Sequence, residues 1–243
     1  MDANWIIRKI KLGETPVFKA IRALLRAIDR PSAPRIPNFL RPVLRLAYEF
    51  HFLIIMAARW LLVVVYRHPL FQARCASVGR GLSLERLPYV TGHAEIHIGD
   101  NVYLGSLSIY SGRFVERPRL IIKDRAEISG TVVVNKEVII EEDARIAPGC
   151  RISDSDGHPR QADLRAQNAP VDLADIRPVR ICRYAWIGNG CHIMKGVTIG
   201  EGAVIGANSV VISDIPPYSL AMGNPAEVYF RNYGRPSKEA ASP

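Results

Sequence analysis

The chain has 243 residues, of which 48% are hydrophobic, enough to bury one sizeable core, so it is not a disordered tail. Its net charge of +9 is concentrated at one end, because residues 1–90 hold 15 Lys/Arg against 5 Asp/Glu, and residues 91–243 hold 17 against 18. A basic segment of this kind attracts nucleic acid, acidic substrates or an anionic membrane surface.

The N-terminal region, residues 1–74, is predicted to be helical, basic and amphipathic. A helix is expected to begin at Thr15 and Pro16. Its apolar face is Phe18, Ile21, Leu24, Leu25 and Ile28, and its basic face is Lys19, Arg22, Arg26 and Arg30. In the next segment, 41–67, the charged residues lie within a sector of about 80° on a helical wheel; they are Arg41, Arg45, Glu49, Arg59 and Arg67.

This arginine stripe favours contact with a membrane surface. A simple membrane span is disfavoured, because Arg59 would lie in the middle of the helix at a cost of about 2.5 to 3.5 kcal/mol. A helix in the plane of the bilayer interface keeps the stripe among the headgroups. Alternatively, the helices only cap an exposed strand edge of the next domain. Nucleic acid is not expected as a partner, because the basic residues alternate with aliphatic rather than aromatic residues.

From residue 122 onward the sequence repeats every six positions. An aliphatic residue recurs in two runs: Ile122, Ile128, Val134, Ile140, Ile146, Ile152, and then Ile181, Ile187, Ile193, Ile199, Ile205, Val211. A period of six fits neither a helix nor an alternating strand, but it fits short strands that form the flat sides of a stacked prism. The two runs predict four coils, and looser spacing upstream predicts one or two more.

The count breaks once, in a polar loop at residues 153–180. The stretch "SDSDGHP" supplies Asp154, Asp156 and His158. A histidine can take a proton from a hydroxyl at neutral pH, and a nearby carboxylate can orient its ring. The residue types also suit an ordinary solvated turn.

The stretch "WIGNGCHIMKGVTIGEGAVIGANSVV" resembles the hexapeptide-repeat acyltransferases, which are left-handed parallel β-helices. The resemblance implies a mainly β domain at residues 75–231, followed by a C-terminal tail at 232–243. In sugar O-acetyltransferases of this family the base lies in a "GHP" loop before a "WIG" coil, so the resemblance implies His158 as general base. Asp156 and Asp154 are the candidates for the carboxylate that orients its ring. Asp154 and Trp186 are expected to contact the acceptor, or Trp186 packs instead against a neighbouring subunit.

The resemblance also implies acetyl-CoA as the donor, bound along the C-terminal coils of a homotrimer. The residues expected to bind it are Gly188, Asn189, Lys195, Gly206, Ala207, Asn208 and Arg231. No metal is expected, although the same fold carries zinc-dependent carbonic anhydrases, because His97, His158 and His192 lie far apart in register. The four cysteines form no CxxC pair and, with no signal peptide evident, indicate a reduced cytoplasmic setting.

The expected function is therefore O-acetyl transfer to a saccharide hydroxyl, with a lipid-linked glycan as a candidate acceptor in polysaccharide biosynthesis. The basic helices would hold the enzyme on the cytoplasmic face of the inner membrane. Three alternatives stay open: a non-catalytic membrane-associated scaffold, a lipid or small-molecule acceptor, and an acyl carrier protein as donor.

Overall fold

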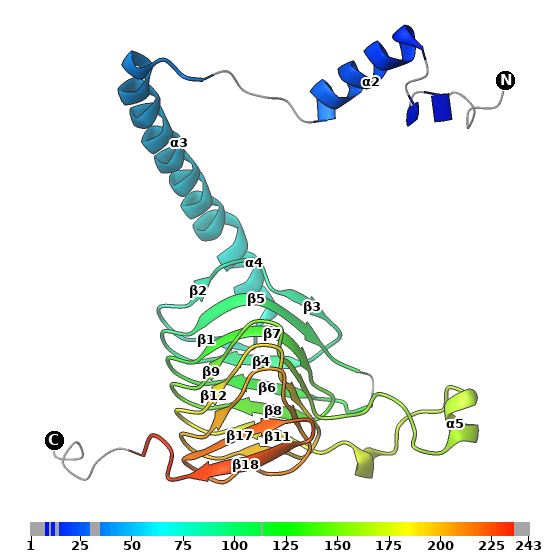
Figure 1. Cartoon of the computed structure of the whole chain (residues 1–243). Helices are drawn as coiled ribbons and strands as arrows, with labels where there is room; N and C mark the ends of the chain where they lie inside the picture. The colour runs from blue at the N-terminus through cyan, green and yellow to red at the C-terminus, as the bar shows by residue number, and fades with distance from the viewer. Residues whose placement is uncertain (1–7, 10, 13–14, 30–34, 113, 236–243) are drawn as a thin grey trace. The chain divides into compact units, whose positions relative to one another are not determined.

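A computed structural model describes residues 8–9, 11–12, 15–29, 35–112 and 114–235 (Figure 1). The chain divides into two compact units, Met1–Ala57 and Ala58–Pro243, which we describe separately. Of the predicted features, Arg30, the side chain of Ile28 and residues 236–243 of the C-terminal tail lie outside the described residues.

The first unit contains the predicted amphipathic helix, α2 (Pro16–Asp29). The Thr15 hydroxyl accepts a hydrogen bond from the Phe18 amide at 3.3 Å, and so caps the first turn. The helix therefore begins where the Thr15–Pro16 pair predicts.

A continuous helical segment, Asn38–Arg74, begins in the first unit and ends in the second. It comprises a 3₁₀ turn η1 (Asn38–Leu40), helix α3 (Arg41–Leu62), a π-helical turn η2 (Val63–Arg67) and helix α4 (His68–Arg74). No residue of α3 is buried. By length and composition this is the one helix, among the described residues, that could cross a membrane.

The last part of this segment packs on the β domain. Phe71 of α4 is 1% exposed and belongs to the core of the second unit. The Arg67 guanidinium donates to the Glu85 carbonyl at 2.7 Å, and that of Arg74 donates to the Gly92 carbonyl at 2.6 Å. Residues 67–74 thus cap the first coil. Arg67 is hydrogen-bonded to that coil, so it does not belong to the exposed arginine stripe that the sequence predicts.

We expect Phe71→Ala to destabilise the β domain by about 3 to 5 kcal/mol, because the substitution leaves a cavity beside the first coil. Phe39→Ala is the matched control, since Phe39 is 77% exposed. Chemical denaturation followed by circular dichroism measures both. Equal stability of the two variants would contradict the capping role of α4.

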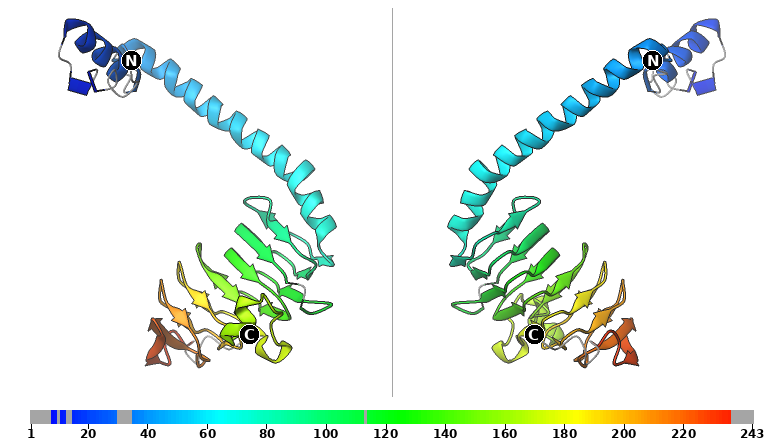
Figure 2. Two further views of the ribbon diagram at one scale, coloured as in Figure 1. Left: turned by 90° about the vertical axis from the view of Figure 1, so that its right-hand side faces the viewer. Right: turned by 90° about the vertical axis from the view of Figure 1, so that its left-hand side faces the viewer.

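The second unit is a parallel β-helix whose coils stack on one another (Figure 2). In the described part of the chain its first face has six strands, and a bridge between Ile199 and Ile215 extends it, giving about seven turns. The six strands are β1 (Ser77–Val78), β4 (Glu95–Ile98), β6 (Arg119–Ile122), β8 (Glu137–Ile140), β11 (Val179–Ile181) and β14 (Thr198–Ile199).

The other two faces are joined because β5 (Tyr103–Tyr110) and β7 (Glu127–Val133) bend around a corner and serve both. The second face also contains β2 (Ser83–Leu84), β9 (Arg145–Ile146), β12 (Trp186–Ile187), β15 (Val204–Ile205) and β17 (Ser219–Gly223). The third face also contains β3 (Tyr89–Thr91), β10 (Arg151–Ser153), β13 (His192–Ile193) and β16 (Val210–Val211). Strand β18 (Ala226–Arg231) closes the fold antiparallel to β17.

The six-residue pattern correctly predicts the core. All twelve aliphatic residues of the two runs are at most 4% exposed, and together they fill the interior of the prism. The stack is longer than the five or six coils expected. The upstream coils are not evident from the regular spacing, because the stacked residues Ile98 and Ile122 are 24 residues apart, whereas a regular coil has 18 residues.

At one corner the observed strand register differs from the register that the six-residue spacing predicts. Ile152 stacks on Val132, not on Val134, although both valines are buried. Gly130 makes the shorter corner, with φ of +122° and so close an approach that a Cβ would lie 2.3 Å from the Cys150 carbonyl oxygen. Only glycine tolerates this conformation without strain.

The predicted insertion lies between β10 and β11, and contains a short helix α5 (Ala162–Ala166) and a 3₁₀ turn η3 (Leu173–Asp175). Figure 1 shows it leaving the stack of coils as a separate excursion. The coils on either side keep their register, since Ile140 pairs directly with Ile181.

Candidate active site

The inserted loop begins with a buried carboxylate. Asp154 is 0% exposed and accepts backbone hydrogen bonds from Asn135 at 2.8 Å, Lys136 at 2.6 Å and Glu137 at 2.9 Å. Burial raises the pKa of the Asp154 carboxyl, and these hydrogen bonds oppose the rise. Asp154 is predicted to contact the acceptor, but in the structure the residue is fully buried and its carboxylate anchors the loop to the previous coil.

We expect Asp154→Ala to lower the unfolding free energy by roughly 3 kcal/mol, because three amides lose a charged acceptor. Asp163→Ala, an exposed position in the same loop, is the control and should change little. Thermal unfolding together with limited proteolysis of the loop measures the effect. An Asp154→Ala protein as stable as the control, with only a raised KM for acceptor, would restore the acceptor-binding role.

His158 lies on the exposed outer part of this loop. Among the described residues, no hydrogen bond joins its imidazole to Asp156, the carboxylate expected to orient it. Asp156 instead pairs with the Lys195 ammonium. The sequence therefore places the histidine on an accessible loop as predicted, but the predicted role of Asp156 as its direct partner is not supported.

Lys195 is only 7% exposed. Its ammonium contacts Asp156 and lies 3.9 Å from Asp175 Oδ1, so both of its partners belong to the inserted loop. Lys195 is predicted to bind the cofactor, but in the structure its ammonium is directed to these two carboxylates rather than to the surface.

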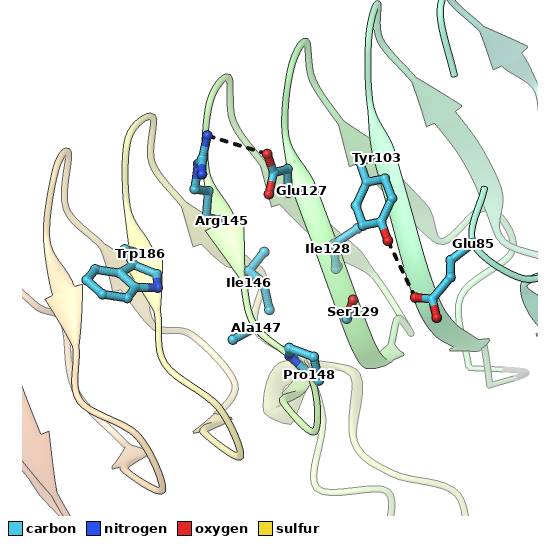
Figure 3. Close-up of a pocket in the computed structure, with 10 residues that line it drawn as sticks. All are labelled: Glu85, Tyr103, Glu127, Ile128, Ser129, Arg145, Ile146, Ala147, Pro148 and Trp186. Atoms are coloured by element: carbon cyan, nitrogen blue, oxygen red, sulfur yellow. Dashed lines mark hydrogen bonds and ion pairs between the residues drawn. The ribbon is translucent and has the colours of Figure 1, made fainter. Parts of the chain in front are cut away.

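Trp186 points outward from β12, as predicted, and is 56% exposed. It lines a cavity of about 570 Å³ on the second face (Figure 3). The other residues that line it are Glu85, Tyr103, Glu127, Ile128, Ser129, Arg145, Ile146, Ala147 and Pro148. Apart from Trp186, sequence reasoning missed this set.

The cavity combines an apolar floor with charged and polar rim groups. Arg145 Nη2 lies 3.4 Å from Glu127 Oε1, and the Tyr103 hydroxyl donates to Glu85 Oε2 at 3.4 Å (Figure 3). Burial, followed by the negative charge of Glu85, raises the pKa of Tyr103. Such a site offers donors, acceptors and an aromatic surface to a polar ligand.

The predicted cofactor residues of the C-terminal coils do come together. Gly188 and Asn189 follow β12, and Gly206, Ala207 and Asn208 follow β15 on the next coil. The Asn208 amide donates to the Asn189 carbonyl at 2.8 Å, so the two segments stack at one corner of the prism. A Cβ on Gly188 would lie 2.7 Å from the Ala207 nitrogen, so the stacked backbones are in close contact.

Arg231 does not join this corner. It pairs with Ser219 at one end of the β17–β18 ladder, while Met222, which lies next to Gly206, pairs with Glu227 towards the other end. Glu227 is thus the charged residue of β18 on the side of the cofactor residues.

No group of three or more His, Cys, Asp or Glu side chains that could hold a metal ion occurs in the described ranges.

The comparisons with known proteins are consistent with the repeated coils of the β-helix. Residues 178–213 match the family described as bacterial transferase hexapeptide, with six repeats. The chain is 31% identical over 178 residues to the galactoside O-acetyltransferase of Escherichia coli K12, covering 69% of this chain and 74% of that protein. It is 37% identical over 130 residues to a putative acetyltransferase of Saccharomyces cerevisiae, covering 54% of this chain and 56% of that one.

A solved structure shares the fold. A mutant form of the N-acyltransferase AntD of Bacillus cereus, in complex with dTDP and coenzyme A, superposes with a TM-score of 0.56 at 18% identity. The superposition covers 68% of this chain and 89% of AntD.

The stacked coils and the inserted loop define a β-helix transferase. The chain belongs to the hexapeptide-repeat acyltransferase family. The predicted enzyme class, an acyltransferase, is confirmed.

Proposed function

We propose that this protein transfers an acetyl group from acetyl-CoA to a hydroxyl of a saccharide, with His158 as general base. The observation that carries the proposal is the position of His158: an exposed imidazole on the loop inserted at residues 153–180, in a chain similar over 178 residues to a galactoside O-acetyltransferase. A rigid frame with an accessible base suits chemistry in which two substrates must meet in a fixed geometry.

In this mechanism His158 takes the proton from the acceptor hydroxyl as its oxygen attacks the thioester carbonyl. The tetrahedral oxyanion collapses, the carbon–sulfur bond breaks, and the imidazolium returns the proton to the departing thiolate. No covalent intermediate with the protein is needed. The backbone amides of the corner formed by residues 188–189 and 206–208 are candidates for contacts with the acyl donor.

The cavity beside Trp186 is the proposed acceptor or donor surface. Its aromatic ring suits the apolar face of a sugar or the pantetheine arm, and the carboxylates of Glu85 and Glu127 suit hydroxyl donors. The cavity lies on the second face, while the loop with His158 leaves the third face after β10. A homotrimer, which would place the loop of one protomer beside the cavity of another, is therefore part of the proposal.

Membrane association is the second part of the proposal. Helix α3 exposes a wide apolar surface beside its charged stripe, which suits a bilayer better than water. A lipid-linked glycan, presented at the cytoplasmic face of the inner membrane, is the acceptor class that this arrangement favours. Whether α3 lies in the interface or spans the bilayer determines how the β-helix is held.

The test is an acyl-transfer assay with acetyl-CoA, and in parallel an acetylated acyl carrier protein, against free and lipid-linked glycans. Release of thiol and mass analysis of the acceptor report the reaction. We expect turnover that depends on a glycan and on acetyl-CoA. Turnover with the acetylated carrier protein alone would show that this protein, rather than acetyl-CoA, is the donor. Absence of turnover with every acceptor would favour the non-catalytic scaffold.

A further inference from the structure

A buried lysine lies beneath the loop that carries His158. Lys195 follows β13 on the first coil after the insertion, and both carboxylates near its ammonium, Asp156 and Asp175, come from residues 153–180. A buried ammonium carries a large desolvation penalty unless it is paired with an anion. Lys195 therefore strongly favours the loop conformation that brings these two carboxylates to it.

The ion pairs continue beyond Lys195. Asp175 Oδ1 also lies 2.8 Å from Arg160 Nη2, so two cations and two carboxylates form a neutral cluster. Arg160 and Asp156 both belong to the outer part of the loop, and Asp175 belongs to its return. The cluster thus joins the outgoing and returning segments of the loop to each other and to the β-helix.

His158 lies midway between two members of this cluster, two residues after Asp156 and two before Arg160. Between Asp156 and His158 is Gly157, with φ of +80° and no atom within 4 Å of where its Cβ would be. No side chain fills the space beside this glycine, although its amide donates to the Ser155 hydroxyl at 3.1 Å. After the histidine, the Arg165 guanidinium donates to the carbonyls of Pro159 at 3.1 Å and Arg160 at 2.7 Å. The ion pairs of Asp156 and Arg160 add a restraint on both sides of His158 that joins these local hydrogen bonds to the β-helix.

The base of the loop is held separately. The Arg177 amide donates to the Asp154 carbonyl at 2.9 Å, and the Gly196 amide donates to the Arg177 carbonyl at 3.0 Å. With the buried Asp154 carboxylate, these bonds close the loop without any contribution from the Lys195 side chain. Loss of the Lys195 ammonium should therefore loosen the outer part of the loop without unfolding its base.

We propose that Lys195 is a positioning residue, which fixes the catalytic loop through Asp156 and Asp175 and so holds His158 in its reactive orientation. This inference rests on the proposed function of His158 as general base. It gives a buried lysine, expected from the sequence to bind the cofactor, a role in orienting the base instead.

The experiment measures kcat and KM for acetyl transfer in the full-length protein with Lys195→Met, Lys195→Arg and Asp156→Asn. We expect Lys195→Met to lower kcat by about 10- to 100-fold, since a displacement of about 1 Å in a reacting group has effects of that size. KM for acetyl-CoA should change by less than about threefold, and Lys195→Arg should restore most of the rate, because it keeps the charge. Asp156→Asn, at a half-exposed position, should reproduce the kcat defect even if Lys195→Met folds poorly.

Lys123→Met is the control, because Lys123 also pairs with carboxylates, Glu142 at 3.2 Å and Glu141 at 3.9 Å on the first face, and takes no part in the cluster around Asp156 and Asp175. It should leave kcat unchanged. The double variant His158→Ala/Lys195→Met should be no slower than His158→Ala alone, because Lys195 acts through the histidine.

The outcomes separate this inference from the proposed function. Full activity of His158→Ala overturns the general base and, with it, the role of Lys195. If His158→Ala is inactive while both Lys195→Met and Asp156→Asn keep the wild-type kcat, the positioning role alone is wrong. A large rise in KM for acetyl-CoA with unchanged kcat would also overturn it, in favour of direct cofactor binding.

Discussion

Replacement of His158 by alanine should lower kcat for acetyl transfer by about 10²- to 10⁴-fold, the usual range for loss of a general base. KM for either substrate should change far less, because the imidazole acts on the proton in the transition state rather than on binding. The thermal midpoint should stay close to that of the wild type, since His158 is exposed and, among the described residues, its ring has no hydrogen-bond partner.

The matched control is His97→Ala, which removes an imidazole from the first face, where the His97 ring shares a hydrogen bond of 2.9 Å with the Ser77 hydroxyl. It should retain the wild-type kcat. If His158→Ala were as active as this control, the base would have to lie elsewhere, and the inserted loop would lose its catalytic role.

The second large effect is expected in α3. Ile54 is 67% exposed and lies on the side of the helix opposite the arginine stripe. Ile54→Glu should weaken vesicle binding by about 100-fold, because an acidic residue at the centre of an inserted helix costs about 2.5 to 3.5 kcal/mol. Flotation of the protein with vesicles that contain anionic lipid measures the bound fraction.

Ile212→Glu is the control, because Ile212 is 59% exposed on the β-helix. It should leave vesicle binding unchanged and show that added charge alone does not cause the loss. A wild-type protein that stays soluble without detergent and fails to float with the vesicles would refute membrane association, and would leave the segment Asn38–Arg74 with only the capping role of its last residues.

The regular coils could be predicted from sequence because their cause is local and periodic. Each aliphatic residue of the hexads fills the same position in its coil, so Ile187 and Ile205 are equivalent by geometry. The count failed where the corner changed length, at Gly130, because a single glycine allows a shorter turn that the aliphatic spacing does not register. The position of the inserted loop could be predicted because it interrupts this periodic pattern.

The roles within the site were harder to predict. Asp154, Asp156 and His158 are neighbours in sequence, yet one is buried, one is paired with a lysine and one is exposed. These differences depend on coils 17 to 39 residues away, such as the amides of residues 135–137 and the ammonium of Lys195.

The cavity residues share a signal that could have found them. Three of them precede a buried aliphatic residue by one position and lie in register on successive coils next to that of Trp186: Tyr103, Glu127 and Arg145. A search for polar residues at equivalent outward positions of neighbouring hexads would have identified this face. The search fails without knowledge of the register, because the 24-residue step from Tyr103 to Glu127 differs from the regular 18.

The most direct measurement is a crystal structure of the protein with bound coenzyme A. We predict that the pantetheine arm follows the corner formed by residues 188–189 and 206–208, and that its sulfur lies within reach of His158 of the same or a neighbouring protomer, directly or through one water. Coenzyme A bound on another face, with its sulfur remote from every His158, would contradict the proposed mechanism.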